Sequence, residues 1–419
     1  MWSNMRRGFT INNTERTLIL IMYQFDKGVD RRGTSCIKWD RYKSRYGLDD
    51  VIPLWVADMD FDCGDFIIEA LQRRTAHPIF GYTDPPPEVY EAITAWNRRR
   101  YGCQVEAAQI CMSTGVVSSI ATAVQLFSEK GDKILAQPPV YPPFLNTPAA
   151  LGRTVVENPL VQDDAGQWHF DLDGLQTLLL KDRSIRMLIL CNPHNPVGRC
   201  WPREELSRLL AICAAHDIMV LSDEIHADLV LPGYRHCSVL SLDPALLKNT
   251  VVCASPTKPF NLAGLKVSYI VVSDPERKKQ WDAALKLIGT SSINIYGFAA
   301  MKAAYTHGDK WLEQCVDYID KNLDFVGSFV REHLPKVRYR KPEATYLAWL
   351  DFNEADVGPE FNRELKVDGG VELNNGGSFG TGGAGFQRLN AACPRHTLRE
   401  GLERTARYLA VANITNKRG

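Results

Sequence analysis

Residues 187–198 read MLILCNPHNPVG, and this stretch decides the fold that we predict. Its first five residues are all apolar, which is typical of a strand that is buried on both faces of a parallel sheet. A polar turn begins immediately afterwards at Asn192-Pro193, so we expect the strand to end at Cys191. A strand of this kind needs similar neighbours, and we find them further along the chain.

Two later stretches repeat the arrangement of an apolar run followed by a polar side chain. Residues 218–226 read IMVLSDEIH, with Asp223 at the end of the run. Residues 250–264 read TVVCASPTKPFNLAG, and Lys258 follows the run closely. Because the carboxyl ends of parallel strands share one edge of a sheet, Asn192, Asp223 and Lys258 are expected to meet there.

Short apolar runs alternate with helical stretches between about residue 110 and residue 290. This alternation predicts an α/β fold with a mostly parallel sheet and helices on both faces. The further runs that we interpret as strands are Ile110–Met112, Lys133–Gln137, Thr154–Val156 and Val267–Val272. The helical stretches include Val117–Phe127, Arg203–His216 and Arg277–Ile288. Beyond residue 294 the pattern changes to helices with a few short strands, which predicts a smaller α+β domain.

We therefore divide the chain into four parts. Residues 1–21 are interpreted as an extension that is disordered or foreign to the native protein, with Met22 as the true start. Residues 22–52 form an N-terminal arm that joins the small domain. Residues 53–293 form the large domain, and residues 294–419 form the small C-terminal domain.

Composition and charge exclude several classes of protein. Of the 419 residues, 45% are hydrophobic, and 49 basic residues balance 49 acidic ones, so we expect a globular protein without electrostatic attraction to nucleic acid or an anionic membrane. No apolar run approaches the ~20 residues of a membrane-spanning helix. Eleven cysteines without a Cys-x-x-Cys pair indicate free thiols in a reducing compartment, so we expect a cytoplasmic protein.

The three polar side chains at the strand ends match the chemical requirements of pyridoxal 5′-phosphate (PLP). Lys258 can form a Schiff base with its aldehyde, Asp223 can keep its pyridine nitrogen protonated, and Asn192 can hydrogen-bond its O3′ oxygen. Each residue alone has a simpler explanation, because Asn-Pro is a common turn, an aspartate after a strand is often a helix cap, and a lone lysine is usually solvated. Their combination at one sheet edge favours the cofactor.

A site for the cofactor's phosphate is expected where a strand meets a helix at residues 112–119. Free backbone N–H groups at the start of a helix bind anions, although an ordinary Ser/Thr cap would give the same pattern. The residues that we expect around the phosphate are Gly115, Val116, Val117, Ser255, Thr257 and Lys266. Tyr141 is a candidate for stacking on the pyridine ring, with simple core packing as the alternative.

These residues resemble the fold-type I PLP enzymes of the aspartate aminotransferase superfamily, the class I/II aminotransferases. The resemblance is stronger to one branch, the MalY/PatB-type carbon–sulfur β-lyases, often called cystathionine β-lyases, and it extends from Met22 to the C-terminus. The segments that carry it are Asp30–Thr34, Trp55–Phe61, Phe80–Thr83, Pro139–Phe144, Cys191–Gly198, Ser222–His226, Lys258–Gly264, Arg388–Asn390 and Cys393–Arg395. The implied fold is a PLP-dependent transferase-like large domain with a smaller domain.

The resemblance also implies roles for individual residues. Lys258 would be the catalytic acid and base, with Tyr141 as a second catalytic residue, and Arg388 would hold the substrate's α-carboxylate together with Asn192. His226 stands where aminotransferases usually have a tyrosine that bonds O3′, and a histidine satisfied within the structure is the alternative. Tyr82 matches a tyrosine that reaches the phosphate of the neighbouring subunit, so a homodimer with shared active sites is implied. The substrate's side chain would meet Trp55, Asp58, Tyr82 and Tyr346.

The implied reaction is an α,β-elimination from cystathionine or a related cysteine S-conjugate, which yields a thiol, pyruvate and ammonia. A class I/II aminotransferase would use the same residues and is the alternative. A regulatory or binding protein built on a PLP-enzyme fold is a second alternative, which the presence of Lys258 and Asp223 disfavours. The expected partner is a sulfur-containing amino acid.

Two other sequence patterns do not indicate a binding site. Gly380–Gly385 satisfies G-x-G-x-x-G, but the strand before it and the helix after it that a dinucleotide site needs are missing. We interpret residues 369–385 as a flexible glycine-rich loop that delivers Arg388 to the site. The nine histidines are dispersed without metal-ligand spacing, so no metal site is expected.

Overall fold

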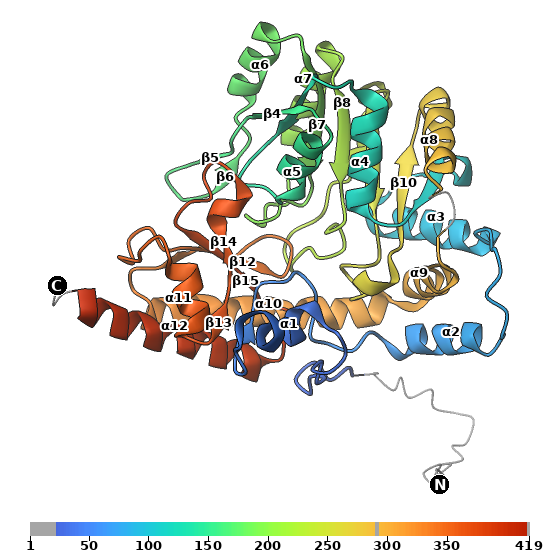
Figure 1. The fold of residues 1–419 in the computed structure, drawn as a ribbon. Coiled ribbons are helices and arrows are strands. Elements are labelled where there is room, and N and C mark those ends of the chain that lie inside the picture. The colour runs from blue at the N-terminus through green and yellow to red at the C-terminus, as the bar shows by residue number, and fades with distance from the viewer. Residues whose placement is uncertain (1–21, 290–292, 417–419) are drawn as a thin grey trace.

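A central sheet dominates the computed structural model, which describes residues 22–289 and 293–416 (Figure 1). The predicted extension, residues 1–21, lies outside the described residues. In the described part of the chain the central sheet has the strand order β2-β10-β9-β8-β7-β3-β4. Its strands are β2 (Ile110–Ser113), β3 (Lys133–Ala136), β4 (Thr154–Glu157), β7 (Ile185–Cys191), β8 (Met219–Asp223), β9 (Thr250–Ala254) and β10 (Ser268–Val272). The apolar runs predicted from the sequence are therefore the strands of this sheet.

All neighbouring strands from β9 to β4 are parallel, and only β10 runs antiparallel to both β9 and β2 within this sheet. Strands β2, β8 and β10 are buried along their whole length, as expected for a sheet that is covered on both faces. The predicted fold class, a mostly parallel sheet with helices on both faces, is confirmed.

The side chains of successive strand residues pack against different sets of helices. Ile189 and Leu221 pack in a cluster with α4 (Val116–Phe127), α5 (Pro143–Ala150) and α8 (Pro275–Leu287). Their neighbours Leu188 and Val220 pack in another cluster, with α3 (Pro87–Tyr101), α6 (Leu172–Lys181), α7 (Arg203–Ala215) and α9 (Ile295–His307). This alternation follows from the two-residue period of a strand.

The C-terminal part of the chain forms a second, smaller sheet beside the large one (Figure 1). Its antiparallel strands have the order β11-β12-β15-β14, with bounds Arg338–Tyr339, Leu347–Asp351, Phe386–Asn390 and Asn374–Asn375. The helices of this part are α10 (Asp309–His333), α11 (Phe361–Val367) and α12 (Arg395–Asn416). In Figure 1 the long helix α10 runs along the base of the molecule.

The N-terminal segment pairs with the C-terminal part of the chain. Helix α1 (Ile37–Tyr46) precedes β1 (Ile52–Pro53), which pairs in parallel with β13 (Val371–Glu372) of the C-terminal part. Helices α2 (Asp65–Thr75) and α3 pack against α9. The arm at residues 22–52 thus joins the C-terminal part through β1, and the domain boundary at residue 293 stays a prediction.

Several elements differ from the sequence-based expectation. Helices α1, α5 and α6 were not predicted. Helix α5 contains two prolines, and helix α1 has few apolar residues. Residues 369–385 are more ordered than a flexible loop, since they contain β13, β14 and the 3₁₀ helix η5 (Gly376–Phe379). Phe379 is fully buried, and its carbonyl accepts a hydrogen bond from the backbone N–H of Val140. Among the described residues, no helix combines the length and the apolar character that crossing a membrane requires.

Candidate active site

A cavity of about 430 Å³ opens at the carboxyl edge of β8 and β9, where the sequence predicted a site. The side chains around it come from segments that are far apart in the chain. The lining residues are Ala57, Thr114, Gly115, Val116, Val117, Ser118, Tyr141, Cys191, Asn195, Asp223, Ile225, His226, Thr257, Lys258, Ala263, Lys266 and Val267. Its volume lies within the range of small-molecule sites in proteins.

Lys258 lies half-buried on the cavity wall, four residues after the end of β9. Its Nζ donates a hydrogen bond of 2.5 Å to the carbonyl oxygen of Ala57. Burial lowers the pKa of Lys258 to about 8, and the positive charge of Arg388 acts in the same direction, while Asp58 and Asp223 oppose the shift. A buried amine with this pKa is partly neutral near pH 8 and can act as a nucleophile and as a base.

Asp223 is the last residue of β8 and is buried at the cavity. Its Oδ1 accepts a hydrogen bond of 3.0 Å from the backbone N–H of Ile225. Burial raises the pKa of Asp223 to about 7, although this hydrogen bond and the charge of Lys258 oppose the shift. A carboxylate in this state is stabilised by a further cation, such as a protonated ring nitrogen, placed beside it.

His226 lines the same cavity and is also buried. Its Nδ1 has no hydrogen-bond partner within the described residues. Burial, followed by the positive charges of Lys258 and Arg388, holds the pKa of His226 well below its usual range, so the imidazole is neutral. A buried ring nitrogen without a partner, on a residue that lines a cavity, indicates a place for a polar group of a ligand.

The start of α4 forms the part of the cavity wall where an anion would bind. Gly115 precedes the helix, and the first backbone N–H groups of a helix have no partner within it. Thr257 and Lys266 line the cavity as predicted, whereas Ser255 does not. The Oγ of Ser255 donates to the carbonyl oxygen of Val267 at 2.6 Å and accepts from the backbone N–H of Thr257 at 3.0 Å, so Ser255 supports Thr257 from behind.

The asparagine that borders the cavity is Asn195, and the prediction that selected Asn192 is wrong on this point. Asn192 is fully buried behind the sheet edge, where its Nδ2 donates to the carbonyl oxygen of Cys237 at 2.9 Å. The reason is the alternation of the strand, because Cys191 pairs with Asp223 and the next residue therefore faces the opposite side. This alternation argues against Asn192, whereas the turn that brings Asn195 to the cavity leaves no such signal in the sequence.

Arg388 lies on β15 and is held from three sides. Its Nη1 donates to Asn195 Oδ1 at 3.0 Å, and its Nη2 donates to the carbonyl oxygen of Trp55 at 2.9 Å and to Asn374 Oδ1 at 2.8 Å. Burial lowers the pKa of Arg388 to about 10, while Tyr141 and Tyr346 oppose the shift. Its Nε is buried without a partner among the described residues. The guanidinium is thus positioned beside Asn195, which lines the cavity, and it carries the charge that a ligand carboxylate needs.

The other residues predicted around the substrate lie in different surroundings. Trp55 offers its backbone carbonyl to Arg388, while its indole ring lies 4.0 Å from the guanidinium carbon of Arg41. The carboxylate of Asp58 does not border the cavity, because Arg31 binds both of its oxygens, at 2.7 and 3.0 Å. Despite the opposing effect of burial, the hydrogen bonds from Arg31 lower the pKa of Asp58. Asp58 is thus held in an ion pair, and its contact with the substrate stays a prediction.

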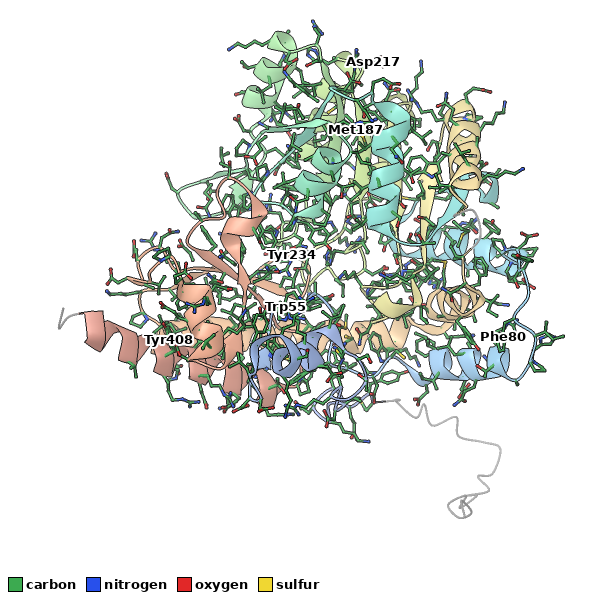
Figure 2. The ribbon with its side chains drawn as sticks, in the orientation of Figure 1. Trp55, Phe80, Met187, Asp217, Tyr234 and Tyr408 are labelled. Atoms are coloured by element: carbon green, nitrogen blue, oxygen red, sulfur yellow. The ribbon has the colours of Figure 1, made fainter. Side chains whose placement is uncertain are left out.

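Two predicted aromatic residues have opposite placements. Tyr141 lines the cavity, and burial raises its pKa. Tyr82 is fully exposed and does not reach this cavity within one chain. It belongs to a loop that also exposes Ile79 and Phe80, and Figure 2 shows Phe80 at the right-hand edge of the molecule, whereas Trp55 lies near its middle.

Sequence reasoning did not single out Ala57 and Cys191, which border the cavity, and it named Tyr346 for contact with the substrate's side chain rather than with the backbone. The Oη of Tyr346 donates to the carbonyl oxygen of Ala57 at 2.9 Å. In the described part of the chain, no group of three or more His, Cys, Asp and Glu side chains is placed to hold a metal ion.

The residues around the cavity fit pyridoxal phosphate. Lys258 provides the amine for its aldehyde, the buried Asp223 lacks the cation that a pyridinium nitrogen supplies, and His226 has an unpartnered nitrogen. The start of α4 provides N–H groups for its phosphate.

Comparison with known proteins gives a consistent result. A model of the family described as aminotransferase class I and II matches residues 49–404. Cystathionine β-lyase PatB from Bacillus subtilis is 42% identical over 91% of this chain and 98% of its own length, and protein MalY from Escherichia coli is 32% identical over 91% and 97%. The crystal structure of cystalysin from Treponema denticola, which contains a pyridoxal 5′-phosphate cofactor, superposes with a TM-score of 0.90 at 32% identity and covers 94% of this chain and 100% of that one. The chain therefore belongs to the aminotransferase class I and II family, in the branch of the MalY/PatB-type carbon–sulfur lyases.

Proposed function

We propose that the protein is a PLP-dependent carbon–sulfur β-lyase that cleaves cystathionine or a related cysteine S-conjugate. The observation that carries this proposal is that Lys258 and Asp223 line one cavity, while Arg388 is bonded to Asn195 on its wall and its charge acts on Lys258. With cystathionine and one water molecule, the products are homocysteine, pyruvate and ammonia.

Arg388 binds the α-carboxylate of the substrate through its guanidinium group. Asn195, Asn374 and the carbonyl of Trp55 hold this group in place before the substrate arrives, so little ordering is required on binding. This arrangement fixes the substrate's Cα with respect to the side chains that act on it.

Lys258 carries the proton transfer. When bound, PLP supplies the electron sink that stabilises negative charge at Cα. Lys258 would provide the amine that holds the cofactor's aldehyde and, when it is free, the base that removes the Cα proton of the substrate. Because the pKa of Lys258 is about 8, a useful fraction of the amine is neutral near neutral pH. Loss of the sulfur group from Cβ then completes the elimination.

Asp223, His226 and Tyr141 hold the cofactor's ring in the orientation that this chemistry needs. Asp223 would retain the proton on the pyridine nitrogen, the neutral His226 would offer a ring nitrogen to a polar group of the cofactor, and Tyr141 would pack against the ring. Val116, Val117, Thr257 and Lys266, which line the same cavity, would hold the phosphate. Cys191 closes the cavity behind Asp223, with which it pairs in the sheet.

The same residues would support an aminotransferase, and the likeness to PatB over nearly the whole chain favours the lyase. The test is the release of pyruvate from cystathionine without any added keto acid, measured in the wild type and in Lys258→Ala. We expect pyruvate and a visible PLP absorbance band in the wild type and neither in the variant. Turnover that requires a keto acid would exclude the lyase, and a wild type without the PLP band would exclude the whole proposal.

We further propose a homodimer with shared active sites and a cytoplasmic location. Ile79, Phe80 and Tyr82 expose 65%, 57% and 110% of their surface in one loop, and a second copy of the chain would cover them and bring Tyr82 to the partner's phosphate site. All eleven cysteines are free, as is usual in a reducing compartment. Sedimentation of the wild type and of Phe80→Asp tests the dimer, which we expect only in the wild type.

A further inference from the structure

The carbonyl oxygen of Ala57 accepts two hydrogen bonds from side chains inside the molecule. Lys258 Nζ lies 2.5 Å from this oxygen, and Tyr346 Oη lies 2.9 Å from it. The two donors are therefore neighbours on one acceptor, and both lone pairs of the carbonyl are used. A carbonyl that already accepts from a phenol is a weaker acceptor for an ammonium group than a carbonyl that has no other donor.

Tyr346 is fixed in this position by an unusual backbone conformation. The preceding residue, Thr345, has a φ of +73°, which is rare for a β-branched residue and costs conformational energy. Both residues are fully buried, and Thr345 Oγ1 accepts a hydrogen bond from the backbone N–H of Leu347 at 3.1 Å. Such strain persists only where the surrounding structure determines the conformation, and it is common at functional sites.

The segment before Thr345 shows what determines the conformation. Glu343 forms a buried ion pair with Arg199, whose Nη1 lies 2.5 and 2.6 Å from the two carboxylate oxygens. The backbone N–H of Glu343 donates to the carbonyl of Gly198 at 2.9 Å. Gly198 has a φ of +70°, and a Cβ there would come within 2.2 Å of Pro342. The segment before Thr345 is thus held against the turn that carries Asn195.

We propose that Tyr346 is a positioning residue for Lys258. Its hydroxyl holds the carbonyl group of Ala57, and this carbonyl binds the amine of Lys258 when that amine is not bonded to the cofactor. In this position the lone pair of the amine points toward the substrate. The inference rests on the proposed function, because in that reaction Lys258 is free only after the substrate amine has taken its place on the cofactor. A neutral amine that donates one N–H to Ala57 has its lone pair pointing away from that oxygen. Because Tyr346 occupies the second lone pair of the carbonyl, the site favours a neutral amine over an ammonium.

The charged groups that face Lys258 must stay constant in a test of this idea. They are Arg388, Lys266, Asp58 and Asp223, with the neutral His226 nearby. Tyr346→Phe removes one hydroxyl and leaves all of them in place. Tyr269→Phe is the matched control, because Tyr269 is equally buried and its hydroxyl accepts a hydrogen bond from Asn97 at 3.0 Å, away from the cavity.

The experiment measures the reactivity of the lysine itself. The full-length chain, freed of PLP, is treated with cyanate between pH 6 and 10, and carbamoylation of Lys258 is followed by peptide mass spectrometry. Cyanate reacts with the neutral amine, so the rate reports how much of it is present at each pH. We expect the midpoint of the curve of carbamoylation rate against pH to move upward by ~0.5 pH unit or more in Tyr346→Phe, because the Ala57 carbonyl then binds the ammonium form of Lys258 more strongly. We expect the wild-type midpoint in Tyr269→Phe.

Steady-state kinetics of the PLP-loaded enzyme with cystathionine provide the second measurement. We expect kcat of Tyr346→Phe to fall ~10-fold with KM within about twofold, because Arg388 is unchanged while the amine is less well placed. A midpoint equal to that of the wild type would overturn the inference, whatever the kinetics. A shifted midpoint in a protein that releases no pyruvate would leave the inference standing and refute the proposed function instead.

Discussion

Replacing Glu343 by alanine tests the buried ion pair that anchors the segment before Tyr346. The Arg199 and Glu343 side chains are 6% and 9% exposed, and Glu343 also accepts a hydrogen bond of 2.9 Å from the backbone N–H of Cys200. Removing one partner of a buried pair costs ~3–5 kcal/mol, because a buried charge is left without compensation. Glu205 lies 3.1 Å from Arg199 Nη2 and still balances part of the charge of Arg199. We therefore expect the free energy of unfolding to fall by ~3 kcal/mol, at the lower end of that range.

The assay is urea unfolding followed by circular dichroism, with two further variants for comparison. Glu354→Ala removes a carboxylate that pairs with Arg338, but these side chains are 60% and 69% exposed, so we expect a loss below ~1 kcal/mol. Arg199→Met combined with Glu343→Leu removes both buried charges and should restore most of the stability. If Glu343→Ala lost no more stability than Glu354→Ala, the reasoning about the buried pair would be refuted.

Three further predictions concern the site. Asp223→Asn should lower kcat for pyruvate release by ~100-fold or more, because an amide does not hold the ring proton, and near-wild-type kcat would contradict that role. Arg388→Lys should raise KM for cystathionine ~10-fold or more, because lysine lacks the planar donors, and an unchanged KM would place the carboxylate elsewhere. The pKa of Lys258 is lowered to about 8, so the reactive amine prevails above pH 8 and declines below it. Stopped-flow capture of PLP by the apoprotein should therefore accelerate about fivefold from pH 7 to pH 8 and level off above pH 9, and a flat profile would contradict the shift.

The sequence was sufficient to predict the strands of the central sheet and the edge where the chemistry lies. Strands buried on both faces are continuous apolar runs, so β7, β8 and β9 could each be recognised in the sequence. The polar residues that follow two of these runs identified Asp223 and Lys258. The antiparallel direction of β10 was not predictable in this way, because pairing between strands that are distant in the chain leaves no mark on a local apolar run.

The choice between the two asparagines shows how a local signal was misread. Asn192 follows β7 directly and therefore looked like the end-of-strand ligand. The strand's two-residue period gives Cys191 the same face as Asp223, with which it pairs, and turns Asn192 to the other face. Asn195 reaches the cavity because three further residues of the turn bring the chain back. Position next to a strand was thus a weaker criterion than the face on which the side chain falls.

Backbone carbonyls explain why part of the site could not be predicted from residue types at all. The carbonyl of Trp55 holds Arg388, and the carbonyl of Ala57 holds Lys258, so the carboxylate-binding group and the base are both aligned on the same short stretch of chain. Asn390, two residues beyond Arg388, fastens that stretch by donating to the carbonyls of Val56 and Asp58, at 2.6 Å each. Any residue provides a carbonyl, so this arrangement leaves no trace in side-chain chemistry. It does, however, fix the distance between carboxylate binding and proton transfer, because only Val56 separates the two acceptors along the chain, in a segment that bends at residues 56–58. The segment at residues 55–58 is therefore the part of the site that sets the position of the substrate's Cα against the amine of Lys258.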